Sequence, residues 1–303
     1  MSLRYSRPIV LAAVALMSAF AGGGCSRDAN ASSSASGPAN PDEKRYPLTG
    51  EIVSADLERK VLIVTHDEIK DYMPAMTMEF LVSKADAANA RTGQRIRAEL
   101  VERKGEYFLE KIWPDDSLTV RALDASAKAL AQDTATRGRG VYREVGEAAP
   151  DFTLLDQEGR AIAASKFRGK KVMMNFIFTR CPIATMCPAA TQKMAGLQQA
   201  AKEAGVTDVE FVSVSLDPEY DTPGVLKEYA ELRGLDLSNW SFLTGPDAAV
   251  RHLLAQMGII REFEGATIKH NLATLLIDPS GRIIHRVDGS RWDTQEFLPK
   301  MKR

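Results

Sequence analysis

The chain has 303 residues, which is enough for two ordinary domains. Its 39 Lys and Arg side chains nearly balance 40 Asp and Glu, so no excess of positive charge indicates nucleic-acid binding. After residue 25 no apolar run is long enough to cross a bilayer as a helix.

The first 25 residues have the pattern of an export signal. A short basic region precedes the apolar stretch from Pro8 to Ala21, and small residues then lead to Cys25. This pattern resembles a bacterial lipoprotein signal, which implies lipidation of Cys25 and a periplasmic protein anchored to the membrane. The alternative is an ordinary secretory signal. Residues 26–44 are small and polar, which predicts a flexible tether.

Residues 45–118 form the first predicted domain. Short strand patterns alternate there with turn residues such as Gly93 and Gly105. Five strands in so short a segment predict a small closed barrel of the OB type. The predicted strands are Gly50–Asp56, Lys60–Thr65, Met76–Val82, Arg95–Leu100 and Tyr107–Ile112.

His66, Met76 and Met78 in this domain are candidates for a soft-metal site, although their spacing alone favours ordinary core packing. Met76 and Met78 are two residues apart, so both side chains project from one face of a strand. Thioethers and imidazole suit Cu(I). The alternative is that both methionines belong to the core and that His66 lies at the surface.

The string from His66 to Met78 resembles the CusF-type periplasmic copper-binding domain. The resemblance implies that His66, Met76 and Met78 are copper ligands. Met73 stands where that family has a tryptophan over the metal. Either Met73 supplies an added sulfur ligand, or the adjacent Tyr72 takes the place of the missing ring.

Residues 119–144 predict a linker helix, with its regular part between Leu123 and Gln132. The α/β pattern of the second domain, residues 145–303, follows. Its apolar run Val172–Phe178 predicts a buried strand, and a helix begins at Pro188.

The loop between that strand and that helix holds Cys181 and Cys187. It lies at the carboxyl end of a strand, where open α/β sheets carry their chemistry. If Cys25 is lipidated, these two cysteines are the only ones left, so they pair, bind a metal or react.

The remaining pattern predicts a thioredoxin-like order of strands and helices. The fold class is therefore α+β with two domains, an OB-like barrel followed by a thioredoxin-like domain. Further predicted elements are the strands Val209–Asp217, Ala273–Asp278 and Arg282–Asp288 and the helices Thr222–Arg233, Pro246–Met257 and Thr294–Lys302.

Several motifs together resemble the Sco/SenC family of thioredoxin-fold copper chaperones. They are Pro150-Asp-Phe, Phe178-Thr-Arg-Cys-Pro, Val214-Ser-Leu-Asp-Pro and Lys269-His-Asn. The resemblance implies that Cys181, Cys187 and His270 bind one copper ion, as Cu(I) or Cu(II). Asp217 ends a strand expected beside the loop, so we expect its carboxylate to orient the site without binding the metal. Five residues separate the cysteines here, whereas the family usually has three.

The leading hypothesis is a membrane-tethered periplasmic copper chaperone. Its client would be the copper centre of a cytochrome c oxidase subunit or another periplasmic cuproprotein. One alternative is an enzyme, a thiol–disulfide oxidoreductase with Cys181 and Cys187 as the redox pair, although the Cys-x-x-Cys spacing of thioredoxins is absent. Others are copper buffering, or a stabilising disulfide beside a core histidine.

Overall fold

The computed structural model describes residues 43–265 and 267–302. The predicted export signal, Cys25 and nearly all of the predicted tether lie outside the described residues. Within the described residues, no helix combines the length and the apolar character needed to cross a bilayer.

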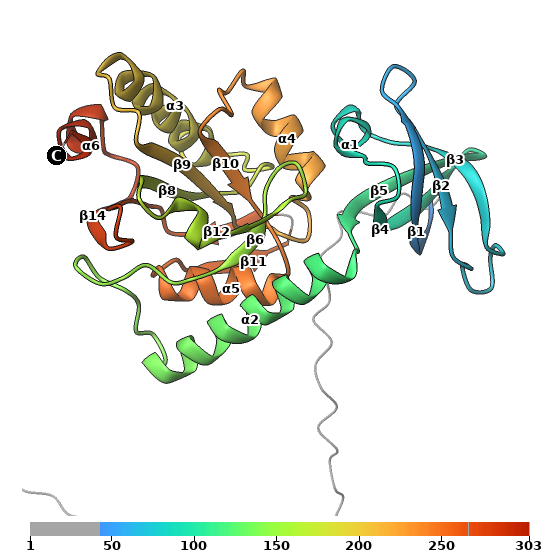
Figure 1. Ribbon diagram of the computed structural model, residues 1–303, viewed down its shortest axis with the longest axis horizontal. Coiled ribbons are helices and arrows are strands. Elements are labelled where there is room, and N and C mark those ends of the chain that lie inside the picture. The colour runs from blue at the N-terminus through green and yellow to red at the C-terminus, as the bar shows by residue number, and fades with distance from the viewer. Residues whose placement is uncertain (1–42, 266, 303) are drawn as a thin grey trace, which may run out of the picture. The chain divides into compact units, whose positions relative to one another are not determined.

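Five strands close into a barrel in the order β1-β2-β3-β5-β4 (Figure 1). Its interior is filled by inward side chains such as Leu62, Phe80 and Leu100. The short helix α1 (Lys84–Asn89), which the sequence analysis did not predict, follows β3 directly. The strands are β1 (Lys44–Asp56), β2 (Val61–His66), β3 (Met76–Leu81), β4 (Arg95–Arg103) and β5 (Glu106–Pro114).

The predicted linker helix is longer than expected. Helix α2 spans Ser117–Arg137, begins at the N-cap Asp116 and ends at Gly138, whose φ of 96° favours glycine. Its Leu130 carbonyl accepts a hydrogen bond of 3.1 Å from the buried Gln256 side chain of α5 (Asp247–Gln256). Since this helix packs on its neighbours, it is part of the fold rather than a loose connector.

The second domain is built on a five-stranded sheet in the order β10-β9-β8-β13-β14. All of its predicted strands and helices are present. The sheet strands are β8 (Lys171–Ile177), β9 (Val209–Ser215), β10 (Trp240–Leu243), β13 (Ala273–Ile277) and β14 (Ile283–Asp288). The other elements are β6 (Thr153–Leu155), β7 (Ala161–Ala163), η1 (Ala164–Phe167), α3 (Cys187–Glu203), α4 (Pro223–Leu232), β11 (Arg261–Glu264), β12 (Thr267–His270) and α6 (Thr294–Met301).

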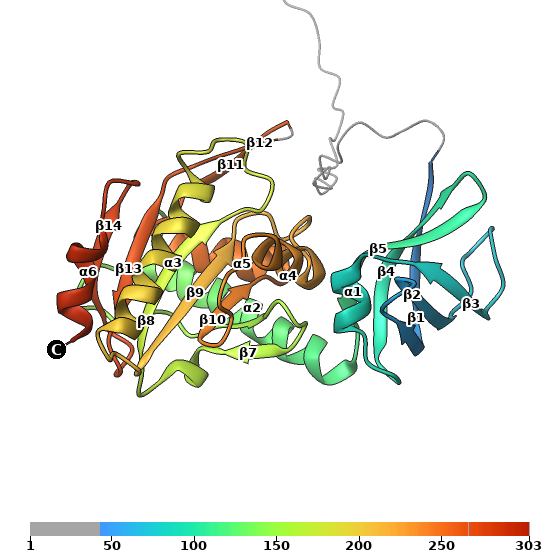
Figure 2. The ribbon, with the colours of Figure 1, turned by 90° about the horizontal axis from the view of Figure 1, so that it is seen from above.

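Strand β8 lies at the centre of this sheet and is buried over nearly its whole length. It runs parallel to β9 and antiparallel to β13. The loops that leave β8 and β9 and the segment that enters β13 therefore meet at one edge of the sheet. The hairpin β11–β12, which the sequence analysis missed, projects from the end of the sheet and leads into β13 (Figure 2).

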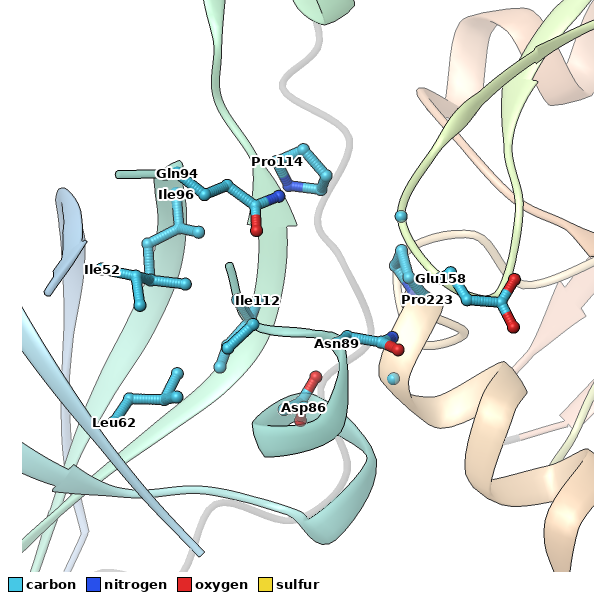
Figure 3. A pocket seen from close by; sticks show the side chains of 13 residues that line it. Ile52, Leu62, Asp86, Asn89, Gln94, Ile96, Ile112, Pro114, Glu158 and Pro223 are labelled. Carbon is cyan, nitrogen blue, oxygen red and sulfur yellow. The ribbon is translucent and has the colours of Figure 1, made fainter. Parts of the chain in front are cut away.

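A small pocket lies beside α1 (Figure 3). Apolar side chains such as Ile52 and Ile112 line it together with Asp86 and Asn89. Burial raises the pKa of Asp86 to about 6. No cysteine, histidine or methionine is among the described residues that line this pocket, so it is separate from both predicted metal sites.

Candidate metal centres

The two cysteines have different surroundings, although one loop carries both. Cys187 is the first residue of α3 and is fully buried in the core. Cys181 lies at the start of the loop and is only partly buried, with its Sγ 3.8 Å from the Ile183 carbonyl. Both thiols are free.

His270 lies beside the buried thiol. It is the last residue of β12, and its Nε2 is 3.7 Å from Cys187 Sγ. Its Nδ1 is 2.8 Å from the Asn271 carbonyl. Because a carbonyl oxygen only accepts, Nδ1 carries the proton and the Nε2 lone pair faces the thiol. The structure thus brings together two of the three residues that the sequence analysis assigned to copper.

Burial determines the protonation of both groups. It raises the pKa of the Cys187 thiol, against an opposing hydrogen bond from the Phe178 backbone, and the nearby Cys181 raises it further. Burial also lowers the pKa of His270, so its imidazole is neutral near pH 7. The position of Cys187 at a helix amino end favours the thiolate, but here desolvation outweighs the helix dipole.

The three ligands are not assembled into a finished site. Across residues 43–265 and 267–302, no three Cys, His, Asp or Glu side chains converge closely enough to hold a metal ion. Cys187 and His270 lie 3.7 Å apart, and Cys181 is close enough to the Cys187 thiol to raise its pKa.

The predicted role of Asp217 takes a different form in the structure. Its buried carboxylate accepts a hydrogen bond of 2.6 Å from Arg180 Nε. Any influence on the thiols therefore passes through Arg180, the residue before Cys181. The sequence analysis overlooked Arg180, Thr179 and the fully buried Asp221. Thr179 and Arg180 were part of the quoted motif around Cys181, but the burial of Asp221, their neighbour in space, is invisible in the sequence.

The barrel site is assembled across two paired strands. His66 ends β2, Met76 begins β3, and the antiparallel register places them directly opposite each other. Met78 is on the same face as Met76 and packs against the barrel core. Met76 is 45% exposed. The site therefore runs from the barrel interior to its surface.

His66 has a nitrogen suited to a metal. The side chain is buried, which contradicts the alternative that placed it at the surface. Its Nδ1 donates to the Asp67 carbonyl over 2.8 Å, and its Nε2 is buried without a hydrogen-bond partner among the described residues. A buried lone pair without a partner is costly. A soft cation held by Nε2 and the thioethers would remove that cost, so the donor set fits Cu(I).

Two neighbours fix the position of His66. Gly50 lies opposite it on β1, and a Cβ there would come within 2.9 Å of His66 Cα. The Asp67 carboxylate accepts hydrogen bonds from Arg95 and Thr49, and Arg95 lowers its pKa. Asp67 is thereby held where its carbonyl can orient the imidazole.

Tyr72 makes its side-chain contacts with residues other than His66, Met76 and Met78. Its ring stacks on Tyr46 with centroids 3.9 Å apart, and its hydroxyl donates to Glu102 over 2.8 Å. Met73 is half-buried, packs against the barrel core and pairs with Ile69 through two backbone hydrogen bonds. Of the two substitutes for the missing tryptophan, Met73 is the one without a competing polar contact.

Comparison with known families matches one family model to each of the two parts of the chain that carry a candidate site. A family model described as SCO1/SenC matches residues 141–303, more than half of the chain. The chain belongs to the SCO1/SenC family. A second model, described as copper binding periplasmic protein CusF, matches residues 45–114. This SCO1/SenC protein therefore carries an N-terminal CusF-like domain, and the resemblances to the Sco/SenC and CusF families are confirmed.

Individual relatives align with about half of this SCO1/SenC protein. The SCO1 protein homolog of Bacillus subtilis is 32% identical over 142 residues, which cover 46% of this chain and 72% of the relative. A SCO2-like protein of Rickettsia typhi is 30% identical over 170 residues, covering 52% and 79%. The structure of a SCO1/SenC family lipoprotein from Bacillus anthracis shares 30% identity with a TM-score of 0.49, covering 54% of this chain and 98% of that one.

Proposed function

We propose that this protein binds copper at two sites and transfers it to a client. The observation that carries the proposal is the 3.7 Å approach of Cys187 Sγ to His270 Nε2, beside the loop that holds Cys181. Two thiolates and an imidazole form a site for Cu(I), and they tolerate Cu(II). Copper is the cargo of this site.

Loading of the thiol site requires proton release. Burial keeps the Cys187 thiol protonated, so an arriving copper ion displaces its proton. His270 already presents a free lone pair and releases no proton. The partly buried Cys181 is the ligand that an incoming or departing ion would meet first.

The barrel, which we assign to the OB type, would hold a second Cu(I) through His66, Met76 and Met78. Support comes from the buried Nε2 of His66 without a partner and from the register that pairs His66 with Met76. Met73 is proposed as an added sulfur ligand in place of the family's tryptophan. The exposed thioether of Met76 gives copper a route in and out.

The proposed setting is the periplasm. The CusF model that matches the barrel is described as periplasmic. Residues 1–25 would be a signal that ends in lipidation of Cys25, and residues 26–44 would tether the barrel (45–118), the linker helix (119–144) and the thioredoxin-like domain (145–303). Membership in the SCO1/SenC family supports the copper centre of a cytochrome c oxidase subunit as client, with other periplasmic cuproproteins as alternatives.

A second candidate function is thiol–disulfide exchange with client cysteines. The observation that favours it is the free state of both thiols within one loop. In that case copper would bind only to the barrel.

Copper stoichiometry of the reduced protein separates the two functions. Wild type, Cys181→Ser and Met76→Ala are loaded with Cu(I), desalted and assayed for bound metal. The matched control is Leu57→Ala, which truncates another apolar side chain of the barrel that is 47% exposed. We expect two ions in wild type and in Leu57→Ala, and one in each of the other variants.

One ion in wild type, lost only in Met76→Ala, would contradict copper binding at the thiols and favour the redox function. Two ions in both single variants would contradict the assigned ligands.

A further inference from the structure

The two residues that precede Cys181 are both held by the segment that follows β9. Thr179 donates to the Asp221 carboxylate through its hydroxyl over 2.5 Å and through its backbone N–H over 3.3 Å. Arg180 donates to Asp217 over 2.6 Å, and its guanidinium lies over the Tyr220 ring. Neighbouring residues of the cysteine loop are therefore fixed to one short segment that follows the adjacent strand β9.

Asp221 is buried completely and has its polar partners on two sides. One carboxylate oxygen accepts from the Ser215 hydroxyl at the end of β9 over 2.6 Å, and both oxygens accept from Thr179. Its own backbone N–H donates to the Asp217 carbonyl over 2.8 Å. A buried carboxyl group is costly unless such bonds satisfy it, which makes their geometry specific.

Cys181 depends on this anchoring more than Cys187 does. Cys187 is held by the first turn of α3 and by the core around it. The backbone N–H of Cys181 makes only a long bond of 3.4 Å to the Phe178 carbonyl. Cys181 also packs against the edge of the core, and the two residues before it add the strong hydrogen bonds that its own backbone lacks.

We propose that Asp221 is a positioning residue for Cys181, acting through Thr179, with the Arg180–Asp217 pair as a second attachment. Together these four residues form a clasp that holds the first thiol close to Cys187 and His270 while the rest of the loop stays exposed. This inference rests on the proposed copper function of the thiols, and it adds the residues that preorganise them.

The test removes the hydrogen bond between Thr179 and Asp221 by changing Thr179, the partner on the cysteine loop. Thr179→Val deletes the hydroxyl while keeping the shape, and Thr179→Ser restores it. Ser213→Ala is the matched control, since Ser213 is on β9 and makes buried hydrogen bonds to Asn175 and Trp240 that do not reach the loop. Asp221→Asn, which keeps the volume of the buried group, is the second variant.

Cu(I) affinity of the thiol site is measured by competition with a Cu(I) chelator in a Met76→Ala background. We expect about tenfold or more weaker binding in Thr179→Val, because residues behind metal ligands commonly contribute that much. Asp221→Asn should weaken binding in the same direction, whereas Thr179→Ser and Ser213→Ala should bind as their parent does.

A second readout needs no copper. Amide hydrogen exchange of residues 179–186 in the metal-free, reduced protein should be faster in Thr179→Val than in wild type or Ser213→Ala. Equal exchange and equal affinity in Thr179→Val and Ser213→Ala would overturn the clasp. If wild type binds no copper at the thiols, the proposed function fails, and hydrogen exchange still decides whether the clasp exists.

Discussion

The barrel site and the thiol site present their histidines in the same way but hold their sulfur ligands differently. His66 and His270 each donate Nδ1–H to the carbonyl of the next residue, over 2.8 Å in both cases, which leaves Nε2 for a metal. In the barrel, the ladder between β2 and β3 aligns His66 with Met76. In the second domain, the thiols lie on a loop and at a helix start.

This difference affects whether a sulfur ligand must release a proton when copper binds. Thioethers carry no proton, so the barrel can take Cu(I) without releasing one from sulfur. The Cys187 thiol, whose pKa is raised by burial, must lose its proton when it binds a metal. The barrel is thus suited to capture of Cu(I), and the thiol site to copper binding that depends on pH.

Removal of one histidine should have the largest effect on copper binding, and at one of the two sites only. His270→Ala should weaken Cu(I) binding at the thiol site by more than about 100-fold, because a ligand contributes more than the residues behind it. The barrel site should keep its ion. Competition titrations with His252→Ala as control measure this, and a simultaneous loss of barrel copper would contradict independent sites.

A change of pH should have the next largest effect, because copper affinity should depend on pH more strongly at the thiol site than at the barrel site. Below the pKa of Cys187, displacement of its proton makes copper binding about tenfold tighter per unit rise of pH. The pKa of Cys187 is raised, which keeps this dependence in force through neutral pH, and the lowered pKa of His270 removes any contribution from imidazole.

The measurement compares two proteins over the same pH range. Met76→Ala reports on the thiol site, and the double variant Cys181→Ser with Cys187→Ser reports on the barrel. Equal pH slopes in the two proteins would show that thiol deprotonation does not accompany copper binding.

The smallest expected effect is that of a substitution at Gly50 in the barrel. Gly50→Ala places a Cβ 2.7 Å from the Thr65 carbonyl and 2.9 Å from His66 Cα, so the strand must shift. We expect a loss of about 1–3 kcal/mol in the free energy of unfolding and weaker copper binding by the barrel alone. Gly196→Ala, which meets no atom within 4 Å on α3, is the control. Denaturant titration and metal assay of both variants provide the check, and unchanged barrel affinity would argue against a positioning role for Gly50.

Much of this molecule could be predicted from sequence because its signals are local. The apolar run Val172–Phe178 predicts a central strand, and β8 is that strand. Alternation of Met76 and Met78 predicts a shared face, which β3 has. The length of α2, the helix α1 and the hairpin β11–β12 were missed, because their stability comes from packing and pairing rather than from a strong pattern of their own.

By itself, the sequence determined the residue types at both sites and the order of the elements that carry them, since periodicity and motif spacing are properties of the chain. Tertiary structure alone decided which groups meet: His270 reaches Cys187 across 83 positions through an unpredicted hairpin, and Asp221 accepts hydrogen bonds from Thr179, two residues before Cys181. It also decided protonation. Burial, which depends on every neighbour at once, raises the pKa of the Cys187 thiol despite its place at a helix amino end.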